Sequence, residues 1–319
     1  MRLTFPCGLV LLIVLLPHAQ AQMPLSRENA ETHFFAPVAK ILKVVNEVNL
    51  AFTVTDKKGR FIANLQPDDF ALLDNHQTPE RLTFFQQRSN LPLHLAILID
   101  ASDSVKSRFK FEQHAAQAFV KRIMRTGTDR VVVITFNDRV TTIQEVTGKS
   151  SNVSKSLKKA AAGGDTALYD AIVYASEKLR ELPEQQPTRR GIVVLSDGLD
   201  TVKRSTLQQA KEAAARAETM IFAVSSNIVP DDPDAQGDPI LKDLAQSSGG
   251  IFLPGGDEDQ IKTAFRDLEK ALRNQYVIAY NPAGFRADGS YHTVELVPRK
   301  NGLRANCRRG YYAILRAFH

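Results

Sequence analysis

Three short stretches of the chain carry side chains that could bind a metal ion. Asp100-Ala-Ser102-Asp-Ser104 directly follows the apolar run of residues 94–99, and Ser196-Asp197-Gly198 follows Ile192-Val-Val-Leu. The third stretch, Gly163-Gly-Asp-Thr166, precedes a helix-like pattern. In an open parallel sheet, such loops meet at the carboxyl ends of the strands, where the chain order reverses. We therefore expect two carboxylates and three hydroxyls to converge there.

A site built only from oxygen atoms suits a hard divalent cation. Magnesium prefers octahedral oxygen ligands at roughly 2.0–2.1 Å and retains several waters, so hydroxyls, carboxylates and an open position are appropriate ligands. Two aspartates at most would bind it directly, which leaves the ion incompletely neutralised. Such an ion attracts a carboxylate from another molecule.

This combination of stretches resembles the metal-ion-dependent adhesion site of von Willebrand factor type A domains. The resemblance covers residues 91–275. It implies a metal site that binds magnesium or manganese, with a Glu or Asp of a protein partner completing the coordination. The implied metal-site residues are Asp100, Ser102, Ser104, Thr166 and Asp197. Asp200 either supports the metal through these ligands or caps a helix.

Helix-like and strand-like patterns alternate between residues 91 and 275. The apolar spacing predicts helices over 109–123, 168–179, 207–217 and 261–272, and strands over 94–99, 130–136, 192–195 and 220–224. Residues 140–146 alternate between apolar and polar types and predict a short antiparallel edge strand. The expected fold class is therefore α/β, a doubly wound and mostly parallel sheet of the von Willebrand A or Rossmann-like type.

Both ends of this domain are flanked by short strand-like segments. They cover 48–54, 61–62, 70–73 and 82–85 before the domain, and 276–280, 291–297 and 305–314 after it, and Asp56-Lys-Lys-Gly59 predicts a hairpin turn. We expect one smaller β-sandwich-like domain built from residues 44–90 and 276–319, with the α/β domain inserted. The whole layout resembles exported acidobacterial von Willebrand-A-related proteins.

The first residues have the pattern of a targeting segment. Arg2 precedes the apolar stretch 8–17, and Ala19-Gln-Ala21 is a small-x-small cleavage pattern. We expect a signal peptide over 1–21, a poorly ordered lead over 22–43, and a secreted protein, periplasmic or extracellular, with no transmembrane segment after signal removal. Cys307 would be the one cysteine left, either a buried free thiol or a link to another chain.

Composition indicates a globular chain with a basic balance. Its 319 residues are 43% hydrophobic and 24% charged, and the formal net charge is +6. Basic runs at 155–159 and 299–309 are not accompanied by a nucleic-acid-binding motif, so no nucleic-acid partner is expected. The acidic stretch 227–239 does not have calcium-loop spacing and is expected to be a solvated loop.

Three functions are compatible with these features. The first is a secreted, non-enzymatic, metal-dependent module that binds proteins. The second is a scaffolding component of the cell envelope in which the metal is structural. The third is a metal-assisted hydrolase, for which the sequence shows no Gly-x-Ser-x-Gly elbow, no His-Glu-x-x-His pair and no obvious general base.

Overall fold

Strand β4 (Leu93–Asp100) is buried along all eight of its residues and lies inside a six-stranded sheet. The computed structural model describes residues 47–87, 91–183, 188–227 and 236–314. The expected signal peptide and lead lie outside these residues. The apolar run of β4 has no polar alternation because helices cover both faces of a doubly wound sheet.

The sheet is mostly parallel, as predicted from the sequence. Its order is β6-β5-β4-β7-β8-β9, and β4 pairs in parallel with β5 (Arg130–Phe136) and β7 (Arg189–Ser196). The parallel pairing continues through β8 (Met220–Ser225) to the short β9 (Phe252–Leu253). Only β6 (Val140–Thr147) is antiparallel, and it forms one edge. The α/β fold class and the antiparallel edge strand are therefore confirmed.

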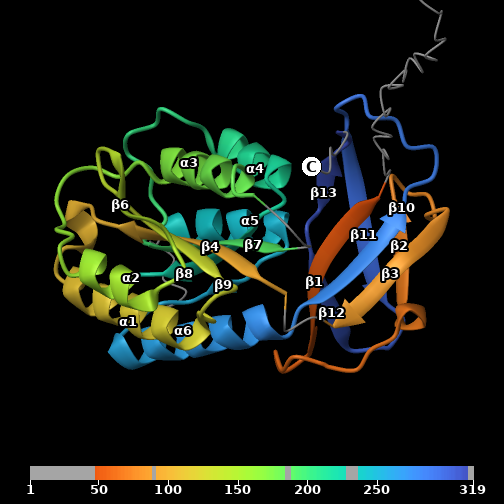
Figure 1. The fold of residues 1–319 in the computed structure, drawn as a ribbon, viewed down its shortest axis with the longest axis horizontal. Helices are drawn as coiled ribbons and strands as arrows, with labels where there is room; N and C mark the ends of the chain where they lie inside the picture. The colour runs from red at the N-terminus through yellow and green to blue at the C-terminus, as the bar shows by residue number, and fades with distance from the viewer. Residues whose placement is uncertain (1–46, 88–90, 184–187, 228–235, 315–319) are drawn as a thin grey trace, which may run out of the picture. The chain divides into compact units, whose positions relative to one another are not determined.

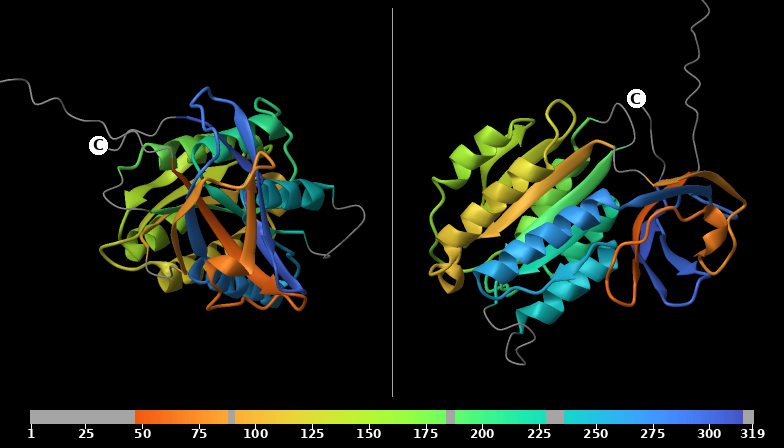
Figure 2. Two further views of the ribbon diagram at one scale, coloured as in Figure 1. Left: turned by 90° about the vertical axis from the view of Figure 1, so that its right-hand side faces the viewer. Right: turned by 90° about the horizontal axis from the view of Figure 1, so that it is seen from below.

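Helices cover both faces of the sheet (Figures 1 and 2). One face holds α1 (Phe109–Ile123), α2 (Ser150–Leu157) and α6 (Glu258–Arg273), and the other holds α3 (Leu168–Arg180), α4 (Leu207–Arg216) and α5 (Gly237–Ser248). Successive side chains of a strand point to opposite faces. Consistent with this, β4 contributes Leu95, Ile97 and Ile99 to one core and Ala96 and Leu98 to the other.

The two ends of the described chain form two antiparallel sheets. The first has the order β12-β1-β10-β3, from β1 (Val48–Asp56), β3 (Arg81–Gln87), β10 (Tyr276–Asn281) and β12 (Leu303–Cys307). The second has the order β13-β11-β2, from β2 (Phe70–Asp74), β11 (Tyr291–Pro298) and β13 (Gly310–Tyr312). Phe52 packs against Phe70 and Tyr276 between the sheets, with ring centroids 5.2 and 5.3 Å away. The expected sandwich of both chain ends is therefore present.

Two details of the strand prediction are wrong. The turn after β1 forms, with Gly59 N donating to Asp56 O at 3.0 Å, but the return segment makes only the single bridge Thr55–Phe61. β1 instead pairs with two strands from the other end of the chain, β10 along one edge and β12 along the other. Residues 305–314 form two strands in different sheets, since the chain changes sheet at Arg308 and Arg309.

Two helices were not predicted, α2 and α5. The stretch 227–239, expected to be a loop, ends inside the first turn of α5, where Asp238 accepts a hydrogen bond of 2.6 Å from Ser225 Oγ. Asp231, Asp232 and Asp234 of that stretch lie outside the described residues. None of the helices that the structure describes is long and apolar enough to span a membrane.

Candidate metal site

Asp100 occupies the carboxyl end of β4 and is fully buried. Its Oδ1 accepts a hydrogen bond of 2.9 Å from Ser102 N, and its Oδ2 accepts one of 2.6 Å from Ser196 Oγ. Burial raises the pKa of Asp100 to about 6, although hydrogen bonds from Ser102 and Ser196 oppose this, and the charge of Asp197 adds to the rise. The fold therefore fixes this carboxylate while leaving its charge poorly compensated.

Ser102 and Ser104 link the carboxyl ends of β4 and β7 through hydrogen bonds. Residues Asp103–Val105 form a short 3-10 helix that turns the chain after β4, so that Ser102 Oγ lies 3.0 Å from Ser104 Oγ. Ser104 Oγ then donates a hydrogen bond of 2.6 Å to Asp197 Oδ2. Two carboxylates and two hydroxyls are thereby gathered at the carboxyl edge of the sheet.

Thr166 comes to the same place on a separate loop. The loop is held to the β4 turn by backbone hydrogen bonds, from Gly163 N to Ala101 O at 2.7 Å and from Asp103 N to Gly164 O at 2.9 Å. Thr166 N donates to Thr201 Oγ1 at 2.9 Å, which fixes the end of the loop. A solvent-facing cleft is lined by Ser102, Ser104 and Thr166, together with Asp103, Asp138, Gly164, Asp165, Leu199 and Thr201.

Asp200 lies beside these residues and binds backbone amides. Its Oδ1 accepts a hydrogen bond of 3.0 Å from Tyr169 N in the first turn of α3, and its Oδ2 accepts one of 2.9 Å from Lys203 N. Asp200 therefore caps the start of α3, which is one of the two roles expected for it from the sequence. Because Thr166 lies two residues before α3, Asp200 also helps to fix the start of the helix that follows the cleft.

The residues present fit a hard divalent cation. The buried carboxylates of Asp100 and Asp197 and the hydroxyls of Ser102, Ser104 and Thr166 provide only oxygen donors. Among the described residues, no three His, Cys, Asp or Glu side chains gather as a ligand cluster, so hydroxyl groups must contribute to any metal site here. The poorly compensated charge of Asp100 is what a bound cation would neutralise.

Residues 95–199 match the sequence profile of the von Willebrand factor type A domain. The chain contains a von Willebrand factor type A domain. The matched range begins within β4 and ends just after Asp197, so it includes all five residues that the motif resemblance singled out. No curated protein matches the chain.

Solved structures with this fold are similar at low identity. The chain aligns with BatB from Bacteroides thetaiotaomicron at 16% identity and a TM-score of 0.45, over 56% of this chain and 98% of BatB. A von Willebrand factor type A protein from Catenulispora acidiphila aligns at 12% identity and 0.49, over 78% and 75%. Proximal thread matrix protein 1 from the mussel byssus, whose adhesion motif is occupied by zinc, aligns at 16% and 0.48, over 62% and 49%.

The type A domain contains one buried acid near this site that the sequence analysis missed. Glu112 of α1 is fully buried, and its Oε1 lies 3.3 Å from Arg108 Nε, close enough for an ion pair but without hydrogen-bond alignment. Burial raises the pKa of Glu112 to about 8, while Arg108 opposes the rise. The sequence pattern does indicate this burial, because Glu112 falls on the apolar face of α1 between Phe109 and Ala116.

Proposed function

We propose that the type A domain is a divalent-metal-dependent binding module that takes up an acidic side chain of a protein partner. The observation that carries the proposal is the link from Ser102 through Ser104 to Asp197 beside a cleft that opens to solvent. Asp100, Ser102, Ser104, Thr166 and Asp197 would hold magnesium or manganese. The bound ion would supply an open coordination position for a Glu or Asp carboxylate.

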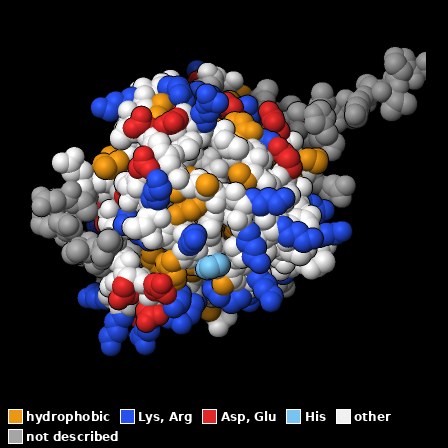
Figure 3. All heavy atoms as spheres, turned by 90° about the vertical axis from the view of Figure 1, so that its left-hand side faces the viewer, with side chains coloured by type: hydrophobic (Ala, Val, Ile, Leu, Met, Phe, Trp, Pro, Cys, Tyr) orange, Lys and Arg blue, Asp and Glu red, His pale blue; other side chains and the backbone are white. Residues whose placement is uncertain are grey.

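The charge around this end of the domain supports an acidic partner. Figure 3 looks onto the end that lies away from the β-sandwich, and Lys and Arg side chains are spread over much of that face, with Asp and Glu in smaller groups. A positive surface favours encounter with acidic molecules and suppresses basic ones. The role proposed is binding rather than catalysis, in a secreted protein.

Direct metal titration is the first test. Calorimetry with magnesium chloride and manganese chloride should show one site in the chain from residue 22 onward. Asp197→Ala should lose it, because one of two carboxylates is removed, whereas the matched variant Asp288→Asn, in an exposed turn of the sandwich, should retain it. Equal heats for both variants would place the metal elsewhere.

Partner capture is the second test and separates binding from a structural metal. The immobilised chain is exposed to proteins of the source cell's envelope and surroundings, with magnesium and then with a chelator. A bound protein that the chelator releases, that Ser104→Ala fails to capture, and that is lost when its own acidic side chain is replaced supports the proposal. If metal raises the melting temperature but leaves capture unchanged, the scaffolding function is favoured instead.

A further inference from the structure

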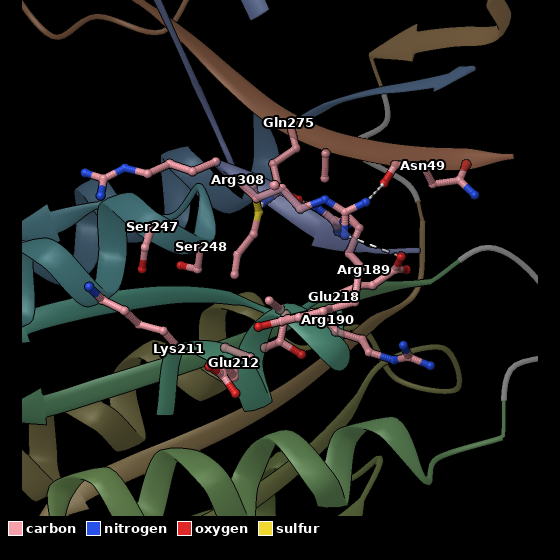
Figure 4. Close-up of a pocket in the computed structure, with 18 of the residues that line it drawn as sticks. Asn49, Arg189, Arg190, Lys211, Glu212, Glu218, Ser247, Ser248, Gln275 and Arg308 are labelled. Atoms are coloured by element: carbon pink, nitrogen blue, oxygen red, sulfur yellow. Dashed lines mark hydrogen bonds and ion pairs between the residues drawn. The ribbon is translucent and has the colours of Figure 1, made fainter. Parts of the chain in front are cut away.

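A large cavity lies at the opposite end of the type A domain from the proposed metal cleft. It has a volume of about 800 Å³ and is bounded by the amino ends of β7 and β8, by α4, and by β1, β10 and β13 of the sandwich (Figure 4). Because the strands are parallel, Arg189 and Met220 at their starts are a full strand length away from Asp197. Small-molecule sites in proteins typically measure about 300–1,000 Å³.

Cationic side chains outnumber carboxylates around this cavity. Within the described part of the chain, two acids line it, Glu212 and Glu218, against five bases, which are Arg189, Arg190, Lys211, Arg308 and Arg309. One further acid, Asp243, pairs with both Lys211 and Arg309, the latter at 3.5 Å. Among the described residues of the lining, bases therefore outnumber acids, which favours an anionic ligand.

Arg189 is the cation least compensated by protein acids. The residue is only 8% exposed, and its guanidinium donates to the carbonyls of Leu91 and Leu272 and to Gln275 Oε1, which are all neutral acceptors. No carboxylate of the described residues lies within ion-pair distance of it, and its buried Nε has no hydrogen-bond partner. Burial lowers the pKa of Arg189 to about 10, the charge of Arg125 adds to this drop, and the charge of Asp129 opposes it.

Arg308 enters the same cavity from the sandwich side. Its Nη2 donates to Asn49 O at 3.0 Å and its Nη1 lies 3.4 Å from Glu218 Oε1, the two contacts drawn as dashed lines in Figure 4. Its Nε is buried without a partner, and the residue is 8% exposed. The cavity is thus lined by two buried guanidinium groups, Arg189 from the type A domain and Arg308 from the sandwich side.

The remaining lining is partly aromatic and apolar. The rings of Tyr291 and Tyr312 meet edge to face with centroids 5.2 Å apart, and Met220, Val277 and Ala214 add apolar surface. Flat rings stack favourably on such tyrosines, and guanidinium groups bind phosphate oxygens through several donors at once. We propose that this cavity binds a small organic phosphate with a flat aromatic portion, a function separate from the proposed metal-dependent binding.

The test uses 1-naphthyl phosphate as the probe on the chain from residue 22 onward, measured by calorimetry. Saturable binding at micromolar to low millimolar concentrations is expected, at least tenfold tighter than for 1-naphthol or for inorganic phosphate. Affinity should fall as salt rises. Binding that is absent, or equally tight for 1-naphthol, would overturn the phosphate site, and equal affinity for inorganic phosphate would overturn the aromatic assignment.

Two variants test whether the probe binds in the cavity, and both leave the buried arginines unchanged. Arg309→Gln and Lys211→Gln remove cations from its exposed side and should each weaken 1-naphthyl phosphate binding threefold to tenfold. Arg266→Gln, on the exposed surface of α6 outside the cavity, is the matched control and should change nothing. If all three variants bind the probe equally, the site lies elsewhere. Ser104→Ala should bind the probe normally, because the metal cleft is at the other end of the sheet.

Discussion

Ser104 Oγ donates a hydrogen bond of 2.6 Å to Asp197 Oδ2, so two residues that are 93 positions apart in the sequence meet at the carboxyl edge of one sheet. The contact depends on two parallel strands, β4 and β7, that end side by side. Because Asp197 is nearly buried and accepts this bond on one oxygen, the hydroxyl partly compensates its charge. Both oxygen atoms belong to residues of the proposed metal site.

Metal addition should raise the melting temperature of the wild type and leave Ser104→Ala almost unaffected. Binding to the folded state alone at one hundred times the dissociation constant adds about 2.7 kcal/mol, which corresponds to roughly 5–10 °C for a domain of this size. Differential scanning calorimetry with magnesium and with chelator measures the difference. Ser154→Ala, which loses a hydroxyl on α2, is the control. An equal rise in both variants would contradict this assignment of Ser104.

Gly198→Ala should destabilise the protein and weaken metal binding together. Gly198 has φ +88°, and an added Cβ would lie 2.3 Å from Gly237 O, so the backbone beside Asp197 must move. We expect a loss of more than about 3 kcal/mol in the free energy of unfolding. Gly284→Ala, at φ +62° with no atom near its added Cβ, isolates the backbone strain and should cost about 1–2 kcal/mol. If urea unfolding gives equal losses of free energy for Gly198→Ala and Gly284→Ala, the close approach of residue 198 to Gly237 O does not add to the backbone strain.

Asp74→Ala should destabilise the β-sandwich strongly. The buried Asp74 carboxylate accepts hydrogen bonds of 2.8 Å from the hydroxyls of Tyr280 and Tyr311, and its Oδ1 lies 2.8 Å from His292 Nδ1. Removing it leaves three buried polar groups without their acceptor, at a cost of about 3 kcal/mol or more. Asp288→Ala, in an exposed turn, should change the unfolding free energy by less than about 0.5 kcal/mol. A small effect at Asp74 would show that water replaces the carboxylate.

The residues of the proposed metal site could be identified from the sequence because their chemistry is local. Asp100, Ser102 and Ser104 alternate within five residues, and an apolar run before them predicts the strand that presents them. The structure places these three and Asp197 in one hydrogen-bonded chain, with Thr166 on the same cleft. The fold class follows similarly from the alternation of helical and strand patterns.

Other features depend on distant partners and could not be predicted. Only Val153 and Leu157 of α2 are buried, so its periodic signal is weak. The basic stretch 299–309 indicates a solvated surface, yet Arg308 is buried because β12 and β13 belong to different sheets and the chain crosses between them. Sequence alone does not place Arg308 and Arg189 in one cavity, since that cavity forms between segments that are far apart in the chain.

Glu112 should make stability fall as pH rises towards 8. Its pKa is raised to about 8 in the folded state from an ordinary value of 4.5, so between these values the folded protein retains a proton that the unfolded chain has released. Stability is therefore highest below about pH 4.5 for this group, declines by up to about 1.4 kcal/mol per pH unit, and levels off above pH 8. Asp100 has the same sign, but its pKa of about 6 limits its effect to lower pH.

Glu112→Gln should abolish this decline, because a neutral amide has no proton to lose. Urea unfolding in chelator at pH 6, 7 and 8 should show the wild type losing about 2 kcal/mol across the range relative to the variant. All other ionisable groups are shared by the two proteins, so their contributions cancel in the comparison. Glu269→Gln, at a half-exposed ion pair between α1 and α6, should follow the wild type. Parallel curves for wild type and Glu112→Gln would mean that Arg108 keeps Glu112 ionised in the core. The two residues would then form a stable buried ion pair, and Glu112 would not be a poorly compensated acid.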